Sequence, residues 1–422
     1  MTGMHTYLAA AAVALALFVN LAVGAVVTAQ SKYSTWMADS IMSRGQGIMT
    51  GEGGSSELLQ AGVTQRALSA LAAQYPRGAE TPRLVRYLRD SAASVVPFTL
   101  NATHDALSYP MDRLSNGNAL LALASVASSN RSTATSSRAA ADALRRSIDL
   151  NRRNTEGGLW YYVYPNWSYL DGMYSLAPFY TLYALDAASS SVDGENATAE
   201  ALDDMSYQLD LLWTRTRNAT TGLLVHGYDA SLTAVWADPV TGASPHVWGR
   251  SLGWYAMALV DTLEMLSHQK SSTTATIACT YRDRILEKWQ SLASALVDAA
   301  DAATGGWWQV LDEPGRDGNY IESSGTAMFA YALLKGSRLG FVAAAEARKA
   351  VSTGIRAHGY LTDTYVVREA NGTLSYDGTV AVCSLNSTAT YEYYVGQPIN
   401  YNSVLGSAPY ILASLEVELL ER

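Results

Sequence analysis

Apolar residues recur at helical spacing along most of the 422-residue chain. They stand three or four positions apart, which puts them on one face of an α-helix. Few segments alternate apolar and polar residues as a half-buried strand does, and residues 360–367 and 379–384 are the best candidates for short hairpins. The predicted helices cover residues 34–44, 55–75, 83–93, 112–128, 136–151, 171–187, 198–215, 251–269, 275–301, 323–339, 342–356 and 402–420.

The predicted helices fall into two classes. One class begins with a cluster of small and polar residues and is then apolar nearly all round, which is typical of a buried helix. The other class is amphipathic and charged, as in residues 136–151 and 275–301. Because the two classes alternate along the chain, the predicted fold class is all-α, an (α/α)6 barrel with short β-hairpins in its rim loops. A superhelical solenoid is the alternative, but spacings of roughly 60 to 80 residues exceed those of ordinary helical repeats.

Three connections place aromatic or histidine residues just after glycine: GGLWYY from Gly157, TGLLVH from Thr221 and GGWWQV from Gly305. Each connection precedes a helix of the buried class, so we expect these loops and the helix N-termini at one rim of the barrel. Aromatic rings stack on the apolar faces of sugars while polar neighbours bind the hydroxyls, so this rim suits a carbohydrate. The alternative is that these aromatic residues fill the core.

The net charge of −9 argues against a nucleic-acid partner, because such proteins cluster Lys and Arg. No Pro-rich or Gly/Ser-rich linker interrupts the chain, so residues 30–422 are predicted to form a single domain. Residues 1–29 contain no Asp, Glu, Lys or Arg, and an apolar run there ends in small residues. This pattern predicts a signal peptide rather than an uncleaved membrane anchor.

Seven N-x-S/T sequons follow the leader and favour a secreted, N-glycosylated protein, although Ser/Thr-rich loops also generate sequons by chance. They lie at Asn101, Asn130, Asn166, Asn196, Asn218, Asn371 and Asn386. The two cysteines, Cys279 and Cys383, are too few for a disulfide framework. They either form one bridge or are buried free thiols, and their spacing does not decide between these states.

Gly249-Arg-Ser-Leu-Gly is a literal G-x-S-x-G match, which is typical of the nucleophile elbow of serine hydrolases. An elbow needs a preceding hydrophobic strand, whereas the residues ASPHVW precede the match here. The two glycines are better explained as room at the start of a helix, so Ser251 is not expected to act. His226 and His246 lack zinc-ligand spacing, so no metal is predicted, although a Ca²⁺ ion held in a loop would leave no such signal.

Asp112 and Asp171 each stand at the start of a predicted buried helix. Either residue alone is explained as a helix cap, because the helix dipole stabilises a carboxylate there. Apolar or aromatic residues flank both, and apolar surroundings raise the pKa of a carboxyl group. A second nearby carboxylate raises one pKa of a pair further, which keeps a proton donor available near neutral pH. The two aspartates therefore predict acid–base chemistry.

Several long motifs agree with one family. They are YLDGMYSLAPFY from Tyr169, HGYD from His226, SPHVWGRSLGWY from Ser244 and GNYIESSGTAMF from Gly318, together with shorter matches near the C-terminus. In these motifs the chain resembles the unsaturated rhamnogalacturonyl hydrolases, glycoside hydrolase family 105, from about Asp112 onward. The resemblance implies an (α/α)6 barrel. It also implies an enzyme that removes the Δ4,5-unsaturated uronic acid from the non-reducing end of lyase-generated pectin (rhamnogalacturonan) oligosaccharides.

The resemblance further implies roles for individual residues. Asp171 is expected to protonate C4 and to help water attack C5 as general acid/base, with Asp112 as its partner. Arg250 can offer a bidentate fork to the carboxylate of the substrate. The residues expected around the sugar are His226, Trp248, Trp254, Tyr169 and Tyr161. No metal or organic cofactor is implied, and Tyr161-Tyr162 stands where the family often carries a histidine.

Two further functions remain open from the residues alone. An inverting glycosidase would use Asp171 as acid and Asp112 as base, with carboxyl groups about 6.5–9.5 Å apart. A non-catalytic carbohydrate-binding protein would have a shallow aromatic groove and no need of two carboxylates. The expected partner is an oligosaccharide with a terminal unsaturated uronate, without nucleic acid or membrane contact after leader cleavage, and a monomer is favoured.

Overall fold

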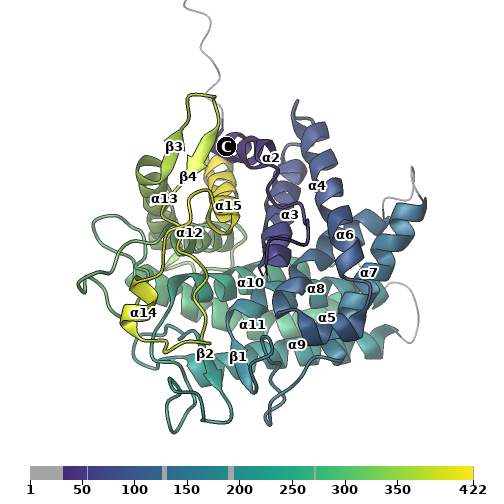
Figure 1. Ribbon diagram of the computed structural model, residues 1–422, viewed down its shortest axis with the longest axis horizontal. Helices are drawn as coiled ribbons and strands as arrows, with labels where there is room; N and C mark the ends of the chain where they lie inside the picture. The colour runs from purple at the N-terminus through teal and green to yellow at the C-terminus, as the bar shows by residue number, and fades with distance from the viewer. Residues whose placement is uncertain (1–31, 55, 126–130, 189–193, 270–271, 422) are drawn as a thin grey trace, which may run out of the picture.

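The computed structural model describes residues 32–54, 56–125, 131–188, 194–269 and 272–421, whose helices and strands are labelled in Figure 1. The predicted signal peptide, residues 1–29, lies outside the described residues. Within the described ranges, six inner helices form a closed ring, because each packs against two inner neighbours. In ring order these are α3 (Glu57–Gln74), η2 (Met111–Asn116) with α6 (Gly117–Ser125), α8 (Asp171–Ala188), α10 (Gly249–Ser267), α12 (Ser323–Arg338) and α15 (Val404–Leu420).

Each inner helix carries one outer helix on its far side. The ring closes where α15 packs against α3, and Figure 1 shows α2 and α15, from the two ends of the described chain, side by side. The predicted (α/α)6 barrel is therefore confirmed. The outer helices, each named before its inner partner, are α4 (Thr81–Val95) on α3, α7 (Arg131–Asp149) on α6, α9 (Gly194–Thr216) on α8, α11 (Ser272–Asp298) on α10, α13 (Ala347–Thr364) on α12 and α2 (Tyr33–Ser43) on α15.

The two sequence classes correspond to the two rings. Every residue of α10 from Gly249 to Leu263 is buried, as an all-round apolar helix requires. The outer helix α7 buries only one face, through residues such as Ala140, Leu144 and Ile148. Close packing also explains one glycine of the G-x-S-x-G match, because a Cβ at Gly253 would lie 2.7 Å from Met328 Sδ on α12. The glycine thus provides room for a neighbouring helix, as predicted.

The strands differ from the predicted hairpins. Residues 360–364 complete α13, and only β3 (Val366–Arg368) pairs with β4 (Leu374–Tyr376). Residues 379–384 contain no strand beyond an isolated bridge at Val380, so that prediction is wrong. The pairing of β1 (Trp167–Tyr169) with β2 (Gly227–Asp229) was not predicted, because strands of three residues carry no readable alternation. The remaining short elements are η1 (Val96–Phe98), α5 (Ala102–Ser108) and α14 (Tyr391–Val395).

Neither cysteine forms a disulfide, so the alternative of one bridge is wrong. Cys383 is a buried free thiol, whereas Cys279 is exposed on α11, so the alternative of two buried thiols is only half right. Glycosylation and secretion stay predictions. The sequon at Asn130 lies outside the described residues, Asn166 is half-buried, and the exposed sequon positions are Asn101, Asn196, Asn218, Asn371 and Asn386. Across the described ranges, no helix is both long enough and apolar enough to span a bilayer.

A buried ion cluster crosses the ring. Arg66 of α3 donates from Nε and Nη2 to the carboxylate of Asp261 on α10, at 2.9 and 3.1 Å, although these helices are not neighbours in the ring. From α12, Lys335 Nζ and the Tyr331 hydroxyl donate to Asp261 Oδ1 at 2.5 and 2.6 Å. Burial alone would raise the pKa of Asp261, but Arg66 and Lys335 bring it well below its ordinary value. Asp261 is therefore a fixed anion that links three inner helices.

Asp261→Asn should lower the free energy of unfolding by about 3–5 kcal/mol, because it leaves the half-buried Arg66 without its counter-charge and the buried Lys335 with Glu264 alone. Chemical denaturation monitored by circular dichroism measures this change. Since the pKa of Asp261 is lower in the folded than in the unfolded protein, its contribution should be present above about pH 4 and lost as the pH falls. A matched control is Asp149→Asn, which removes an exposed partner of Arg145 and should cost about 1 kcal/mol or less. Equal effects of the two substitutions would contradict a structural role for the cluster.

Candidate active site

A cavity of about 120 Å³ opens at the rim where the inner helices begin. Asp171 is the first residue of α8 and Arg250 the second of α10, so neighbouring helix N-termini direct these side chains to one place. His226 does not line the cavity. The predicted site residues that do line it are Asp112, Asp171, Tyr161, Tyr169, Trp248, Arg250 and Trp254.

The β1–β2 pair explains how Asp171 comes to lie beside His226. Tyr169 of β1 stands opposite Gly227 of β2, and the Leu170 amide donates to the His226 carbonyl at 3.1 Å. Asp171 follows β1 directly, at the point where the chain turns into α8. The short ladder therefore fixes the start of α8 against the loop that carries the histidine.

Ser251 holds the Asp171 carboxylate. Its hydroxyl donates to Asp171 Oδ2 at 2.5 Å across 80 residues of sequence. The Oδ1 atom accepts no hydrogen bond from the described residues and is left for a ligand. Ser251 was not expected to act as a nucleophile, and its contact with Asp171 was not predicted. Ser251 lies in the first turn of α10, and its position orients the carboxylate rather than making it a nucleophile.

His226 lies behind Asp171 and is fully buried. Its Nε2 is 3.3 Å from Asp171 Oδ2 without hydrogen-bond geometry, and its Nδ1 is 2.8 Å from the Tyr394 hydroxyl. The imidazole also packs on the Trp248 ring, with 4.8 Å between ring centres. It was predicted beside the sugar, whereas its contacts are with the carboxylate and with Trp248. His226 can therefore act on a ligand mainly through Asp171.

Asp112 is the carboxyl group with the perturbed pKa. Burial raises its pKa to about 7; the hydrogen bond from the Tyr161 hydroxyl to Oδ1, 2.9 Å long, opposes this rise, and the negative charge of Asp171 adds to it. A pair in which one carboxyl pKa is raised was predicted, and the structure identifies Asp112 as that member. Near neutral pH the site thus holds an exchangeable proton in contact with the cavity.

Arg250 lines the cavity, but most of the donors of its guanidinium group already have hydrogen-bond partners. Nη1 donates to the Val380 carbonyl at 2.5 Å and Nη2 to the Ala381 carbonyl at 2.7 Å. The guanidinium lies over the Trp248 ring, 4.9 Å from its centre. Arg250 therefore supports the loop that brings Cys383 to the cavity wall, while its positive charge remains beside the two carboxylates.

Aromatic rings form much of the remaining wall. Tyr161 and Tyr169 stack with 4.5 Å between ring centres and 14° between planes, and Trp248 and Trp254 are almost fully buried. Several further lining or supporting residues were not predicted in the site, although GGLWYY and one of the shorter C-terminal matches, YEYY from Tyr391, lie in two of their segments. These residues are Tyr162, Tyr164, Cys383, Ser384 and Tyr394.

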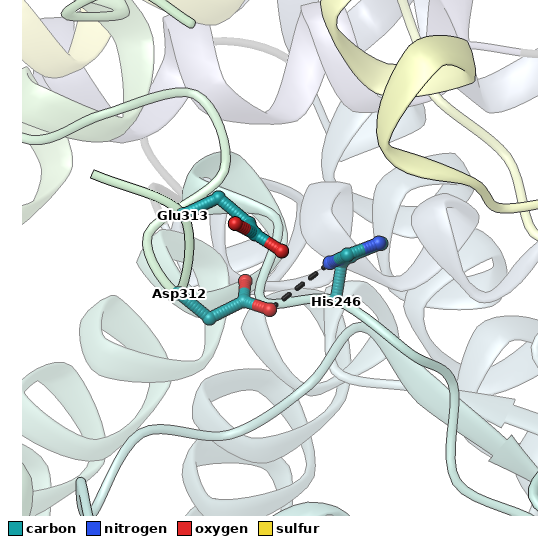
Figure 2. A group of neighbouring side chains, drawn as sticks. All are labelled: His246, Asp312 and Glu313. Carbon is teal, nitrogen blue, oxygen red and sulfur yellow. Dashed lines mark hydrogen bonds and ion pairs between the residues drawn. The ribbon is translucent and has the colours of Figure 1, made fainter. Parts of the chain in front are cut away.

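A group of metal-binding type lies outside this cavity. Figure 2 shows His246, Asp312 and Glu313 with their side chains directed toward one another, and their ligand atoms lie within 4.8 Å of one another. No metal was predicted because His246 has no nearby partner in the sequence. The carboxylates come from a loop 66 residues further on. Within the described ranges this is the one group of its kind.

A second cavity of about 380 Å³ lies further along the barrel, between α3, α4, α6, α8 and α10. It is larger, but its walls are mainly apolar and its buried acid is Asp261. Arg66 and Lys335 hold that carboxylate in its charged form, so it cannot serve as a proton donor near neutral pH. The smaller cavity, with Asp112 and Asp171, is therefore the candidate active site.

Comparisons with known proteins agree over most of the chain. A family model described as Glycosyl Hydrolase Family 88 matches residues 52–420. Protein Atu3128 of Agrobacterium fabrum is 37% identical over 229 residues, which are 53% of this chain and 93% of that protein. The 24.9 kDa protein in the picA locus of Rhizobium radiobacter gives the same identity and coverage.

Solved structures share the barrel. A family 105 glycoside hydrolase of C. acetobutylicum ATCC 824 has a TM-score of 0.74 and 29% identity, covering 92% of this chain and 100% of that chain. The unsaturated glucuronyl hydrolase of Bacillus sp. GL1 has a TM-score of 0.56 and 14% identity, covering 92% and 95%, which shows likeness of fold. The resemblance to family 105 is thereby confirmed, and the chain belongs to glycosyl hydrolase family 88 as the matching model defines it.

Proposed function

We propose that the protein removes a Δ4,5-unsaturated uronic acid from the non-reducing end of lyase-generated pectin (rhamnogalacturonan) oligosaccharides by hydrating the C4=C5 double bond. The observation that carries this proposal is the pair of Asp112 and Asp171, buried together in a small aromatic cavity beside Arg250. The solved neighbour named as an unsaturated glucuronyl hydrolase supports the same class of substrate.

The size of the cavity suits the terminal sugar of an oligosaccharide. Its volume of about 120 Å³ is small beside the ~300–1,000 Å³ of pockets that enclose drug-sized ligands. A single terminal ring can enter this cavity, whose wall includes the stacked rings of Tyr161 and Tyr169 and the ring of Trp248. The positive charge of Arg250 favours a ring that carries a carboxylate. The apolar leader and the sequons support an extracellular place of action for such an enzyme.

The reaction follows from the contacts of the two aspartates. Asp171, free at Oδ1, delivers to C4 the proton that the pair of carboxyl groups holds near neutral pH, and water adds to C5 and returns a proton to the pair. The resulting hemiketal opens to a ketone at C5, and the hemiacetal left at C1 releases the neighbouring sugar. Because the pair holds this proton, the site does not place two negative charges beside an anionic substrate, and Asp112 can contact a substrate hydroxyl.

Asp171→Asn should abolish the loss of ultraviolet absorbance that hydration of the conjugated double bond causes, with kcat lower by about 10²–10⁴-fold. The assay follows absorbance over time with oligosaccharides prepared by a lyase, and the distant exposed Asp149→Asn variant serves as control. If the wild-type protein releases saturated sugars while the absorbance persists, an inverting glycosidase replaces the proposal. If it binds the sugars without either change, a binding protein does.

The pH dependence of kcat/KM should reflect the titration of Asp112. Below about pH 7 the Asp112 carboxyl is protonated, and above it this group adds a negative charge to the site, so kcat/KM for an anionic substrate should fall as the pH rises through that value. Because the folded pKa is raised, deprotonation should also reduce stability between the ordinary carboxyl pKa and about 7. Rate profiles of the wild type and Asp112→Asn measure the first effect. A falling limb near pH 7 that persists in Asp112→Asn would assign it to another group.

Ser251→Ala should lower kcat about 10–100-fold with little change in KM, because a charge-assisted hydrogen bond worth about 1.5–3 kcal/mol is lost from Asp171. The matched control is Ser407→Ala, since this buried serine of α15 bonds only a carbonyl of its own helix turn. Steady-state kinetics of both variants on the same substrate separate the two cases. Complete inactivation of Ser251→Ala, with covalent labelling of Ser251 by a phosphonate in the wild type, would instead mark Ser251 as a nucleophile.

A further inference from the structure

His246, Asp312 and Glu313 form a cluster on two loops that cross beside the active-site rim. His246 lies two residues before Trp248, and Asp312 and Glu313 follow the segment that pairs with it. In Figure 2 the Asp312 carboxylate faces the imidazole, and Glu313 is folded back toward both. The cluster lies outside the cavity lined by Asp112 and Asp171, and the proposed reaction does not use it.

Two of the three ligands already have the spacing of a coordination site. His246 Nδ1 and Asp312 Oδ2 are 3.0 Å apart. Ligand atoms that are each about 2.0–2.2 Å from a divalent ion lie about 3 Å apart when the angle at the metal is near 90–100°. The other oxygen, Asp312 Oδ1, accepts the Val247 amide at 2.7 Å, so the carboxylate is fixed with Oδ2 toward the imidazole. Such outer hydrogen bonds are what orient carboxylate ligands in metal sites.

The backbone around the cluster is already rigid. The Leu311 amide donates to the Val247 carbonyl at 2.9 Å, the Gly249 amide donates to the Gln309 carbonyl at 3.0 Å, and Trp248 bridges Val310. His246 and Asp312 thus stand on two segments joined by these hydrogen bonds and cannot separate without breaking them. The third ligand needs only side-chain rotation, because the half-buried Glu313 side chain is held by a single arginine, Arg316, at 3.3 Å.

The donor set selects the class of ion. One imidazole nitrogen with two carboxylates suits zinc and its first-row neighbours, whereas Ca²⁺ and Mg²⁺ prefer all-oxygen sites. About 15% of the His246 side chain and 28% of the Asp312 side chain are exposed, so an ion can enter and water can complete its coordination. We propose that His246, Asp312 and Glu313 bind one divalent transition-metal ion of the zinc class.

Such an ion would also act on the active site. The His246 carbonyl accepts the His226 amide at 3.1 Å, and the segment that follows His246 carries Trp248, and Arg250 of α10, into the cavity wall. An ion that ties this segment to Asp312 would stabilise the wall against local opening. Binding itself does not depend on the proposed function, since no residue of the cluster touches the cavity.

The test is zinc binding by the full chain after treatment with a chelator and dialysis. Calorimetry should give one equivalent of Zn²⁺ per chain, and Zn²⁺ should raise Tm in a saturable manner while Mg²⁺ and Ca²⁺ do not. His246→Gln should weaken Zn²⁺ binding at least about 10–100-fold, and Glu313→Gln, whose side chain is more exposed and less involved in structure, should weaken it in the same direction.

The matched control is His104→Gln, because His104 faces Asp105 at 3.6 Å but belongs to no three-ligand group among the described residues. It should leave the zinc affinity unchanged. Absence of saturable Zn²⁺ binding by the wild type would overturn the proposal, as would equal affinities of the wild type and both cluster variants. A Ca²⁺ response that His246→Gln does not alter would mean a carboxylate site without the imidazole, which also overturns it.

Discussion

The ion cluster across the barrel is the constraint on which the arrangement of the inner helices depends. A buried carboxylate without counter-charges is very costly, so Asp261 can be buried on α10 only if Arg66 and Lys335 face it. This requirement sets the rotation of α10 about its own axis. Arg250 and Trp254 precede Asp261 by eleven and seven residues, close to whole helical turns, so the three side chains share one face. The face that meets the ions at one end therefore lines the candidate active site at the other.

Most of the fold could be predicted because the local spacing of apolar residues determines it. All-round apolar helices and amphipathic helices alternate along the sequence, and they became the inner and outer rings. The errors arose where local pattern and packing diverge. Residues 360–364 look like a strand because of Tyr360 and Leu361, yet they continue α13, where Ala357 and Leu361 are buried at helical spacing. The β1–β2 ladder joins segments about 60 residues apart, and its register depends on the position of α8.

The sequence predicted which residues belong to the candidate site better than it predicted their contacts. Asp112 and Asp171 were identified from helix starts, Tyr161 lies in a glycine-bounded loop, and the family motifs added Arg250 and the other aromatic residues. The contact of Ser251 with Asp171 spans 80 residues, and that of Arg250 with Val380 spans 130, so neither leaves a local signal. His226 was correctly associated with this region, but only packing shows that it stands behind the carboxylate.

The closure of the ring by α15 has a consequence for biosynthesis. This helix packs against α3 and α2, where Glu418 accepts hydrogen bonds from both the amide and the hydroxyl of Ser34, 384 residues away. It also supplies Leu405 to the wall of the candidate active site. Of the ring helices it is the last to be synthesised, so the faces of α3 and α12 that it covers stay unpaired until it emerges. During synthesis the nascent chain is therefore an incomplete ring whose exposed apolar faces favour aggregation.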